Sequence, residues 1–123
     1  MIVGVGIDVV DIPRFEAVLA RTPALRTRLF TEVERDLPVP SLAGRFAVKE
    51  ALAKALGSPG GLAWTDAEVR RGEHGAPLLL VTGSVAECAA RRGADEFFVS
   101  ISHDGGIATG LVLAQSRAVI GRR

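Results

Sequence analysis

Small and large side chains alternate near the start of the chain, and this alternation strongly restricts how the chain can fold. One parity carries branched apolar residues, namely Val3, Val5, Ile7 and Val9, and the other carries Gly4, Gly6 and Asp8. A period of two predicts a β-strand over Ile2 to Val10. Because glycine has no side chain, another part of the backbone can approach the glycine face closely.

Asp8 is the acidic residue on that glycine face. Burying a carboxylate is costly unless a cation compensates for its charge, and a bound metal ion would do so. The alternative is a structural role, in which Asp8 ends the strand or caps the next helix together with Asp11. We therefore treat Asp8 as a candidate metal ligand.

The segment from Ser41 to Leu56 is expected to be the longest helix, and its charges are unusually placed. At about 100° per residue, one arc collects apolar residues, namely Leu42, Phe46, Leu52, Ala53 and Leu56. Arg45 and Lys49 fall inside this arc, Glu50 lies at its edge, and Lys54 follows one turn later. Alanines on the other faces indicate that the helix is largely covered. We interpret the three cations and one carboxylate as an anion site that also holds a divalent metal; surface ion pairs with snorkelling stems are the alternative.

The remaining segments predict an α+β fold with an antiparallel sheet packed on the long helix. We expect a helix capped by Asp11, a short helix from Thr22 to about Phe30, and a capping box from Thr31 to Glu34. Pro38 and Pro40 should break the chain, with Ser41 capping the long helix. The later elements are predicted as strands 64–70 and 78–82, a helix 84–92, and strands 97–102 and 107–114. Ser116 to Arg123 should be loosely held.

Composition limits the classes of function. With 123 residues the chain is too short for two domains, so residues 1–123 are expected to form a single domain. A net charge of +1 does not favour nucleic acid, and no apolar run approaches the ~20 residues that span a bilayer. Cys88 is the single cysteine, which excludes an internal disulfide and predicts a cytoplasmic location. The dinucleotide-binding fingerprint is incomplete, because Val9 stands at its third glycine.

A basic stretch follows the first strand. Arg14, Arg21, Arg26 and Arg28 occur in a region where Glu16 is the only acid. This local charge predicts an acidic protein partner. RNA is the rival interpretation, but the aromatic residues for base stacking are missing, and a solvated face is a third. His103, at the exit of a predicted strand, would alone indicate only a structural hydrogen bond.

Together these residues resemble a known family, the holo-[acyl-carrier-protein] synthases, which are the short bacterial type of 4'-phosphopantetheinyl transferase. Four segments carry the resemblance in the family's order and span nearly the whole chain: GVGIDVVDIPRF (4–15), RFAVKEALAKALG (45–57), WTDAE (64–68) and SISH (100–103). One segment alone would be weak, but four in register are highly specific. The chain departs from the family in its shorter 31–41 segment, where Leu37 replaces a common aromatic residue.

The resemblance implies a site and its partners. Asp8 and Glu50 match the carboxylates that bind Mg²⁺, and Lys54 matches the lysine near the pyrophosphate of coenzyme A. Arg45 and His103 match positions at the coenzyme A phosphates, and Pro77 and the 57–61 loop match segments near the nucleotide. Arg14, Arg21 and Arg28 match the basic face that docks on the acidic helix of the acyl carrier protein. Such proteins are homotrimers with active sites between subunits.

The implied reaction is Mg²⁺-dependent. It transfers 4'-phosphopantetheine from coenzyme A to a serine of apo-acyl carrier protein and releases adenosine 3',5'-bisphosphate. No residue resembles a covalent nucleophile, so direct in-line transfer is expected, with Asp8, Glu50 and Lys54 as the catalytic group. Either Glu50 or a metal-bound water can take the serine proton. The alternatives are a non-catalytic module that binds coenzyme A or the carrier protein and, more weakly, an RNA-binding protein.

Overall fold

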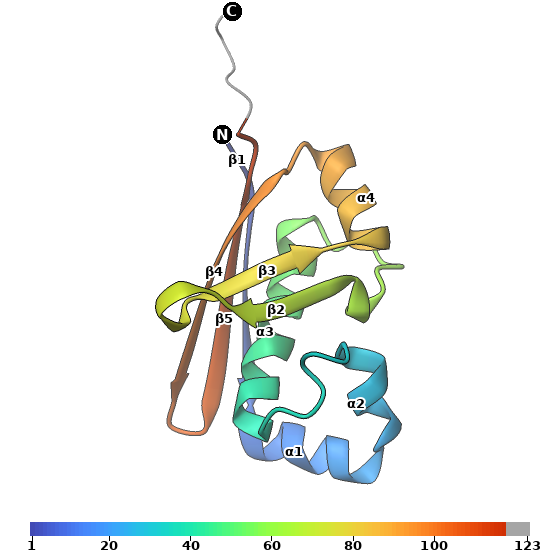
Figure 1. Ribbon diagram of the computed structural model, residues 1–123, viewed down its shortest axis with the longest axis vertical. Coiled ribbons are helices and arrows are strands. Elements are labelled where there is room, and N and C mark those ends of the chain that lie inside the picture. Colours follow the sequence, from blue (N-terminus) through green and yellow to red (C-terminus); the bar gives the residue numbers. More distant parts are fainter. Residues whose placement is uncertain (118–123) are drawn as a thin grey trace, which may run out of the picture.

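The computed structural model describes residues 1–117 and has the α+β fold that the sequence predicts (Figure 1). Its strands are β1 (Ile2–Asp11), β2 (Ala67–Arg71), β3 (Pro77–Val81), β4 (Glu96–Asp104) and β5 (Ile107–Gln115). Its α-helices are α1 (Ile12–Arg21), α2 (Ala24–Leu29), α3 (Val39–Ala55) and α4 (Gly83–Arg92). Two short 3₁₀ turns, η1 (Trp64–Asp66) and η2 (Glu73–Gly75), precede β2 and β3.

The strands form two antiparallel sheets. The larger has the order β1-β5-β4, and the smaller is the β2-β3 hairpin. Asp8 pairs with Gly110 of β5, and Gly110 in turn pairs with Ile101 of β4. Helix α3 packs on one face of the larger sheet, and α1 and α2 lie together at one end of the molecule (Figure 1).

Glycines make the contact between α3 and the sheet very close. A Cβ atom added at Gly4 would collide with the backbone of Ala55, and one at Gly6 with the backbone of Ala51. Gly110 is packed in the same way against Ala47 and Val48. The close approach predicted from the glycine face of β1 is therefore confirmed, and it explains why the first strand carries so little side-chain volume on this side.

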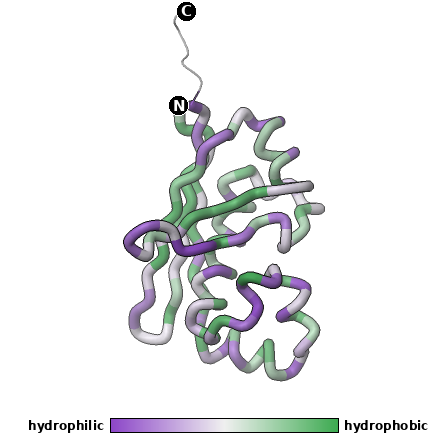
Figure 2. The backbone as a smooth tube through the Cα atoms, viewed as in Figure 1, coloured by the Kyte–Doolittle hydropathy of each residue, from purple (hydrophilic) through white to green (hydrophobic). Residues whose placement is uncertain are grey.

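The opposite face of this sheet is apolar and exposed. Val5, Ile7 and Val9 of β1 are more than half exposed, at 55%, 56% and 63%. Phe98 of β4 is 52% exposed, and it stands across from Leu113. Figure 2 shows hydrophobic residues running along these strands. Val5, Ile7 and Val9 thus face away from the core of this chain, and the glycine face points towards it.

Two apolar clusters flank α3. One contains Leu52, Leu56, Val69, Val85 and Val112, and it joins the C-terminal half of α3 to α4 and the sheets. The other contains Phe15, Leu19, Leu29, Phe30 and Leu42, and it joins the N-terminal half of α3 to α1 and α2. Helix α3 is buried on most of its circumference, as its alanines predict. Within residues 1–117, none of the helices is long and apolar enough to span a bilayer.

Most predicted elements are confirmed, but the starts of two elements are wrong. Helix α3 begins at Val39 rather than after a Ser41 cap, because Pro38 is extended and Pro40 is accommodated in the first turn, where it costs no hydrogen bond. The segment starting at Trp64 begins as a 3₁₀ turn, so β2 starts only at Ala67. The cap of α1 is as predicted: the Asp11 carboxylate accepts a hydrogen bond from the Arg14 N–H at 2.9 Å.

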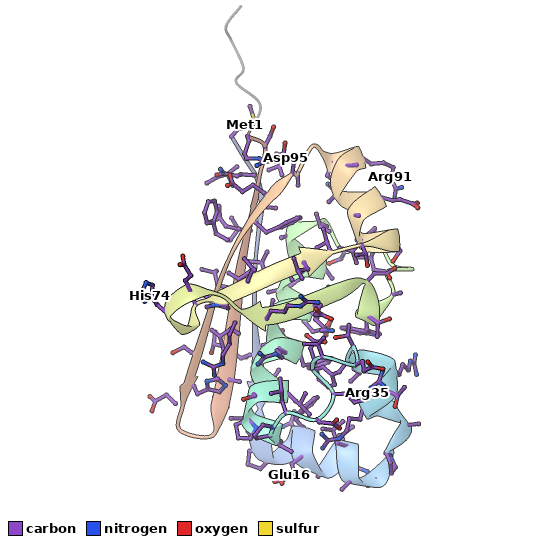
Figure 3. The ribbon with its side chains drawn as sticks, in the orientation of Figure 1. Met1, Glu16, Arg35, His74, Arg91 and Asp95 are labelled. Carbon is purple, nitrogen blue, oxygen red and sulfur yellow. The ribbon has the colours of Figure 1, made fainter. Side chains whose placement is uncertain are left out.

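The start of the C-terminal tail is held more firmly than predicted. The Ser116 N–H donates to the Met1 carbonyl at 2.8 Å, and the Met1 ammonium donates back to the Ser116 carbonyl at 2.9 Å. The Arg117 N–H donates to the Asp95 carboxylate at 2.8 Å. Met1 and Asp95 lie at the same end of the molecule (Figure 3). The rest of the predicted loose tail, 118–123, lies outside the described residues.

Candidate active site

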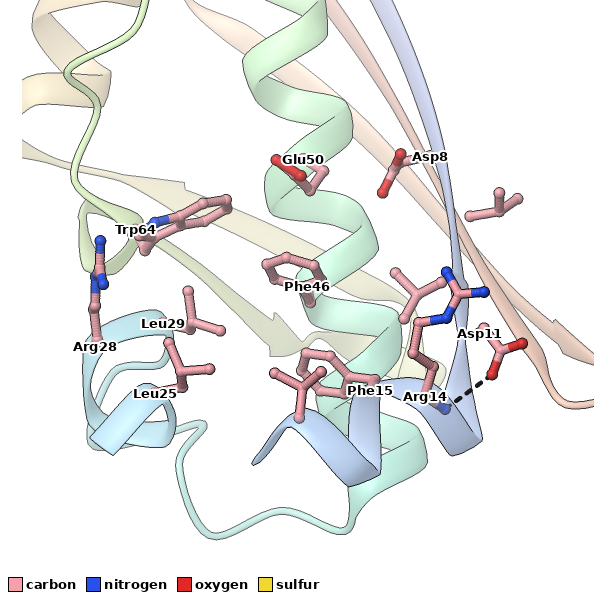
Figure 4. A pocket seen from close by; sticks show the side chains of 13 residues that line it. Asp8, Asp11, Arg14, Phe15, Leu25, Arg28, Leu29, Phe46, Glu50 and Trp64 are labelled. Atoms are coloured by element: carbon pink, nitrogen blue, oxygen red, sulfur yellow. Dashed lines mark hydrogen bonds between the residues drawn. The ribbon is translucent and has the colours of Figure 1, made fainter. Parts of the chain in front are cut away.

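Asp8 and Glu50 line the same pocket, which has a volume of about 500 Å³ (Figure 4). Asp8 comes from β1 and Glu50 from the middle of α3, although they are 42 positions apart in the sequence. Burial raises the pKa of the Glu50 carboxyl group, and the negative charge of Asp8 raises it further. The two carboxyl groups are therefore close enough to interact electrostatically.

The glycine face of β1 explains how these acids meet. Gly4 packs on Ala55 and Gly6 packs on Ala51, so each step of two residues along the strand moves about one turn back along the helix. Asp8 is the next residue on the same face, and it emerges beside the turn of α3 that carries Glu50. A side chain at position 4 or 6 would push the strand from the helix and separate the two acids.

Lys54 is also near this pair. Its ammonium group donates to the Asp8 carboxylate and to the Ile7 carbonyl, both at 3.0 Å. The lysine side chain is 51% exposed and that of Asp8 is 21% exposed, so water reaches this ion pair. Lys54 lowers the pKa of Glu50, but burial and Asp8 outweigh it.

The two acids fit a magnesium site that is completed by other ligands. Mg²⁺ prefers oxygen ligands and is usually bound by one or two carboxylates together with phosphates and water. The repulsion that raises the pKa of Glu50 is what a bound cation would relieve. Within residues 1–117, no group of three or more His, Cys, Asp and Glu side chains forms a metal cluster. A metal ion held by Asp8 and Glu50 would take its other oxygen ligands from water or a bound phosphate.

The other half of the pocket is apolar. Phe15 and Phe46 stack at 5.2 Å between ring centroids, and Phe46 continues to Trp64 at 5.3 Å. Leu25 and Leu29 of α2 complete this wall. Figure 4 shows the aromatic row between the two acids and helices α1 and α2. The sequence patterns do not predict that Trp64 lines this pocket.

Only some residues of the predicted basic face line the pocket. Arg14 of α1 and Arg28 of α2 line it and stand at opposite ends in Figure 4. Arg21 lies in the last turn of α1, is exposed, and is not among the lining residues. Arg26 is also not among the lining residues, and its side chain donates to the Arg35 carbonyl at 3.0 Å.

Arg45, Pro77 and His103 line a different pocket, of about 200 Å³. The Arg45 Nε donates to the Val69 carbonyl at 3.1 Å, and the His103 Nε2 lies 3.0 Å from the Pro40 carbonyl oxygen. Arg70 and Arg71 also line this pocket, although no sequence pattern predicts their presence there. None of its described lining residues is acidic. Burial lowers the pKa of Arg45; Glu34 opposes this effect, and Arg71 adds to it. Such a concentration of positive charge suits a phosphate group.

The two pockets lie at opposite edges of the sheet within one chain. Asp8 is on edge strand β1 and His103 on edge strand β4, with β5 between them. This chain alone therefore brings Lys54 to the predicted metal ligands, but it does not bring Arg45 and His103 to them. Gly60 and Gly61 of the 57–61 loop line a third cavity, which borders Glu50, Lys49 and Trp64.

Lys49 does not belong to the anion site that the sequence predicts. It is buried and forms an ion pair with Glu34 at 2.7 Å. The capping-box pattern predicts only the local bond in which Glu34 accepts from the Thr31 N–H, which is present at 3.0 Å. The partner of Lys49 was missed because 15 residues separate the two, and no local periodicity reports such a contact.

The fold and the site together define a class: a small α+β protein with a paired-carboxylate pocket and a separate basic pocket, suited to a phosphate-containing ligand and a divalent cation. A family model described as the 4'-phosphopantetheinyl transferase superfamily matches residues 4–112. The chain belongs to this superfamily.

Individual relatives agree with this assignment. The chain is 56% identical over 120 residues to the holo-[acyl-carrier-protein] synthase of Micrococcus luteus, covering 96% of this chain and 95% of the relative. It is similar to the coenzyme A complex of the synthase from Chronobacterium ammoniagenes, with a TM-score of 0.79, 30% identity, and 94% and 98% coverage. It is also similar to the Helicobacter pylori synthase in complex with coenzyme A, with a TM-score of 0.79, 31% identity, and 90% and 99% coverage.

Proposed function

We propose that this chain transfers 4'-phosphopantetheine from coenzyme A to a serine of an apo-acyl carrier protein. The observation that carries the proposal is the shared pocket of Asp8 and Glu50, because a magnesium site needs both. The names of the relatives and the bound coenzyme A in two similar structures support the choice of substrates. Residues 1–123 would act as one transferase domain in the cytoplasm, where the lone Cys88 would stay reduced.

The reaction needs no covalent enzyme intermediate. The serine oxygen attacks the phosphorus that bears the pantetheine arm, the pyrophosphate bond breaks, and adenosine 3',5'-bisphosphate leaves. Mg²⁺ held by Asp8 and Glu50 would supply charge neutralisation for the phosphates. Lys54, which is half exposed beside Asp8, would donate to a phosphate oxygen of the leaving group. The serine must also lose a proton, and the Glu50 carboxylate lies in this pocket as a candidate base.

The acceptor protein would dock beside the apolar half of the pocket. Arg14 and Arg28 frame this opening, and Arg21 continues the positive charge along α1. Acidic side chains of a carrier protein would be attracted to this rim, while an apolar side chain could enter between the aromatic row and α2. Coenzyme A would place its phosphates near Lys54 and in the basic pocket of Arg45, Pro77 and His103.

We propose a homotrimer in which neighbouring subunits complete each site, because Asp8 and His103 lie on opposite edge strands of the sheet within one chain. The exposed apolar face around Val5, Ile7 and Phe98 supports this assembly, because a monomer rarely exposes a broad apolar sheet face. Asp8→Ala and His103→Ala chains, inactive alone, should regain activity when mixed and allowed to exchange subunits. Failure to regain activity, with exchange shown by native mass spectrometry, would contradict a shared site.

Intact-mass spectrometry tests the reaction itself. Apo-acyl carrier protein is incubated with the enzyme, coenzyme A and Mg²⁺, and the expected result is a mass gain of one phosphopantetheine group on the carrier. An identical incubation with a chelator should leave the mass unchanged. If the carrier and coenzyme A bind but the mass never changes, the chain is a binding module and not a transferase.

A further inference from the structure

The buried ammonium group of Lys49 is surrounded by oxygen atoms from four separate segments. Its Nζ lies 2.9 Å from the Leu29 carbonyl, 2.7 Å from the Glu34 carboxylate, 3.1 Å from the Trp64 carbonyl and 2.7 Å from the Ala67 carbonyl. The side chains of Lys49 and Glu34 are 1% and 0% exposed. An ammonium group donates three hydrogen bonds, so these oxygens replace its water shell completely.

Glu34 extends the same cluster. One carboxylate oxygen accepts from the Thr31 N–H at 3.0 Å as well as from Lys49, and the other accepts from the Val69 N–H at 2.8 Å. The turn after α2 is therefore fixed both to α3 and to strand β2. Burial lowers the pKa of Lys49, and the charge and hydrogen bond of Glu34 oppose this effect.

These segments also build the apolar wall of the catalytic pocket. Leu29 ends α2, the helix that also presents Leu25 and Arg28 to the pocket, and Trp64 provides the outer end of the aromatic row. Lys49 immediately precedes Glu50 on α3. The cluster therefore spans from the backbone that carries the catalytic carboxylate to the wall on the other side of the pocket.

We propose that Glu34 and Lys49 are positioning residues that hold α2 and Trp64 at the correct separation from Glu50. Neither residue touches a reactant. This inference rests on the proposed function, in which the carrier protein enters between α2 and the aromatic row. A displaced wall would mainly weaken carrier binding. The basic pocket should change less, although Val69 links it to the cluster by donating its N–H to Glu34 and accepting from Arg45 at its carbonyl.

Glu34→Gln is the first test, because glutamine keeps the size of the side chain. Its amide oxygen can still accept from Lys49, but its NH₂ group cannot accept from the Val69 N–H, and the buried ammonium loses its counter-charge. We expect the KM for apo-acyl carrier protein to rise about tenfold, with kcat and the KM for coenzyme A changed less than about threefold. Glu87→Gln on the exposed face of α4 is the matched control and should change none of these constants.

Trp64 gives a second readout that does not depend on activity. It is the only tryptophan, and the chain has no tyrosine, so intrinsic fluorescence reports this wall alone. In folded Glu34→Gln we expect red-shifted emission and stronger quenching by acrylamide than in the wild type. A merely structural role would lower the unfolding midpoint and leave both the folded-state spectrum and the KM values unchanged.

A double variant covers the case in which Glu34→Gln does not fold. Glu34→Gln with Lys49→Met removes both buried charges, a replacement that is often neutral for stability. The carbonyls of Leu29, Trp64 and Ala67 still lose their donor, so the raised carrier KM and the altered Trp64 spectrum should persist. Wild-type values of both readouts in the folded double variant would overturn the proposal. If the wild type itself shows no transferase activity, the proposed function fails, and the Trp64 spectrum still decides the positioning role.

Discussion

Helix α3 carries two lysine–carboxylate pairs with similar geometry and very different surroundings. Lys49 lies 2.7 Å from Glu34, and Lys54 lies 3.0 Å from Asp8. The first pair is 1% and 0% exposed, whereas the second is 51% and 21% exposed. Five residues rotate the two lysines by about 140° around the helix, so one points towards α2 and β2 and the other towards β1.

The difference separates a group that maintains the fold from one that is free to react. The charges of Lys49 and Glu34 are fully matched by protein atoms, and no capacity remains for a ligand. Lys54 contacts Asp8 and one carbonyl, and the rest of its ammonium group faces water. A substrate phosphate or a cation can therefore exchange with the Lys54–Asp8 contact at little cost, since exposed pairs contribute little to stability.

The strongest test of the exposed side of this comparison removes its carboxylates. Asp8→Ala and Glu50→Ala should each lower kcat/KM on the order of a thousandfold or more, because charge on the transferring phosphoryl group would no longer be neutralised. Circular dichroism should show folded proteins in both cases. Retained transfer activity in both variants would remove the assignment of a metal site.

The two lysines themselves give the next largest contrast. Lys49→Met leaves a buried carboxylate uncompensated and should lower the free energy of unfolding by about 3–5 kcal/mol. Lys54→Met removes only an exposed pair and should change it by less than about 1 kcal/mol. Urea denaturation at matched protein concentration measures both. Equal losses in the two variants would show that burial does not distinguish the pairs.

The basic rim offers a smaller effect. Arg14→Glu should raise the KM for the carrier protein about tenfold at low ionic strength, and added salt should reduce the difference from the wild type. The KM for coenzyme A should not change. Arg91→Glu, the same charge reversal on α4 at the other end of the molecule, serves as the control. A carrier KM that is indifferent to Arg14 would exclude this docking surface.

The smallest expected effect concerns the pH dependence of stability. The pKa of Glu50 is raised in the folded chain, so the folded state retains a proton that the unfolded chain has already released. The free energy of unfolding should therefore fall as pH rises from below 4.5 through the raised pKa. Glu50→Gln lacks this titration and should melt above the wild type at neutral pH, by no more than about 4 °C. A variant that melts below the wild type would contradict the strain assigned to this carboxylate.

Local sequence patterns predicted most of the fold. The strand predicted over Ile2 to Val10, the Asp11 cap and the strands on either side of residues 72–75 and 105–106 all follow from signals within a few residues, and all are present. The start of α3 was misplaced because a proline fits either a break or a first helical turn, and the local sequence does not distinguish these.

The candidate site was less predictable from the sequence than the fold. Asp8 was identifiable because an acid on a glycine face contradicts its surroundings, and the family resemblance pointed to Glu50. The buried contacts of Lys49 were not predictable, because its four oxygen partners come from residues 29–67 and depend on how α2, η1 and β2 pack. Tertiary packing likewise brings Trp64 and Arg71 to their pockets, and no spacing in the sequence predicts these positions.

A crystal structure with coenzyme A and Mn²⁺ in place of Mg²⁺ would show whether Asp8 and Glu50 share one metal ion, because the anomalous signal of manganese locates the ion. We predict one ion bound by carboxylate oxygens of both Asp8 and Glu50 and by a phosphate of coenzyme A, with Lys54 turned towards the pyrophosphate. An ion bound elsewhere, or coenzyme A seated with no ion at these two side chains, would contradict it.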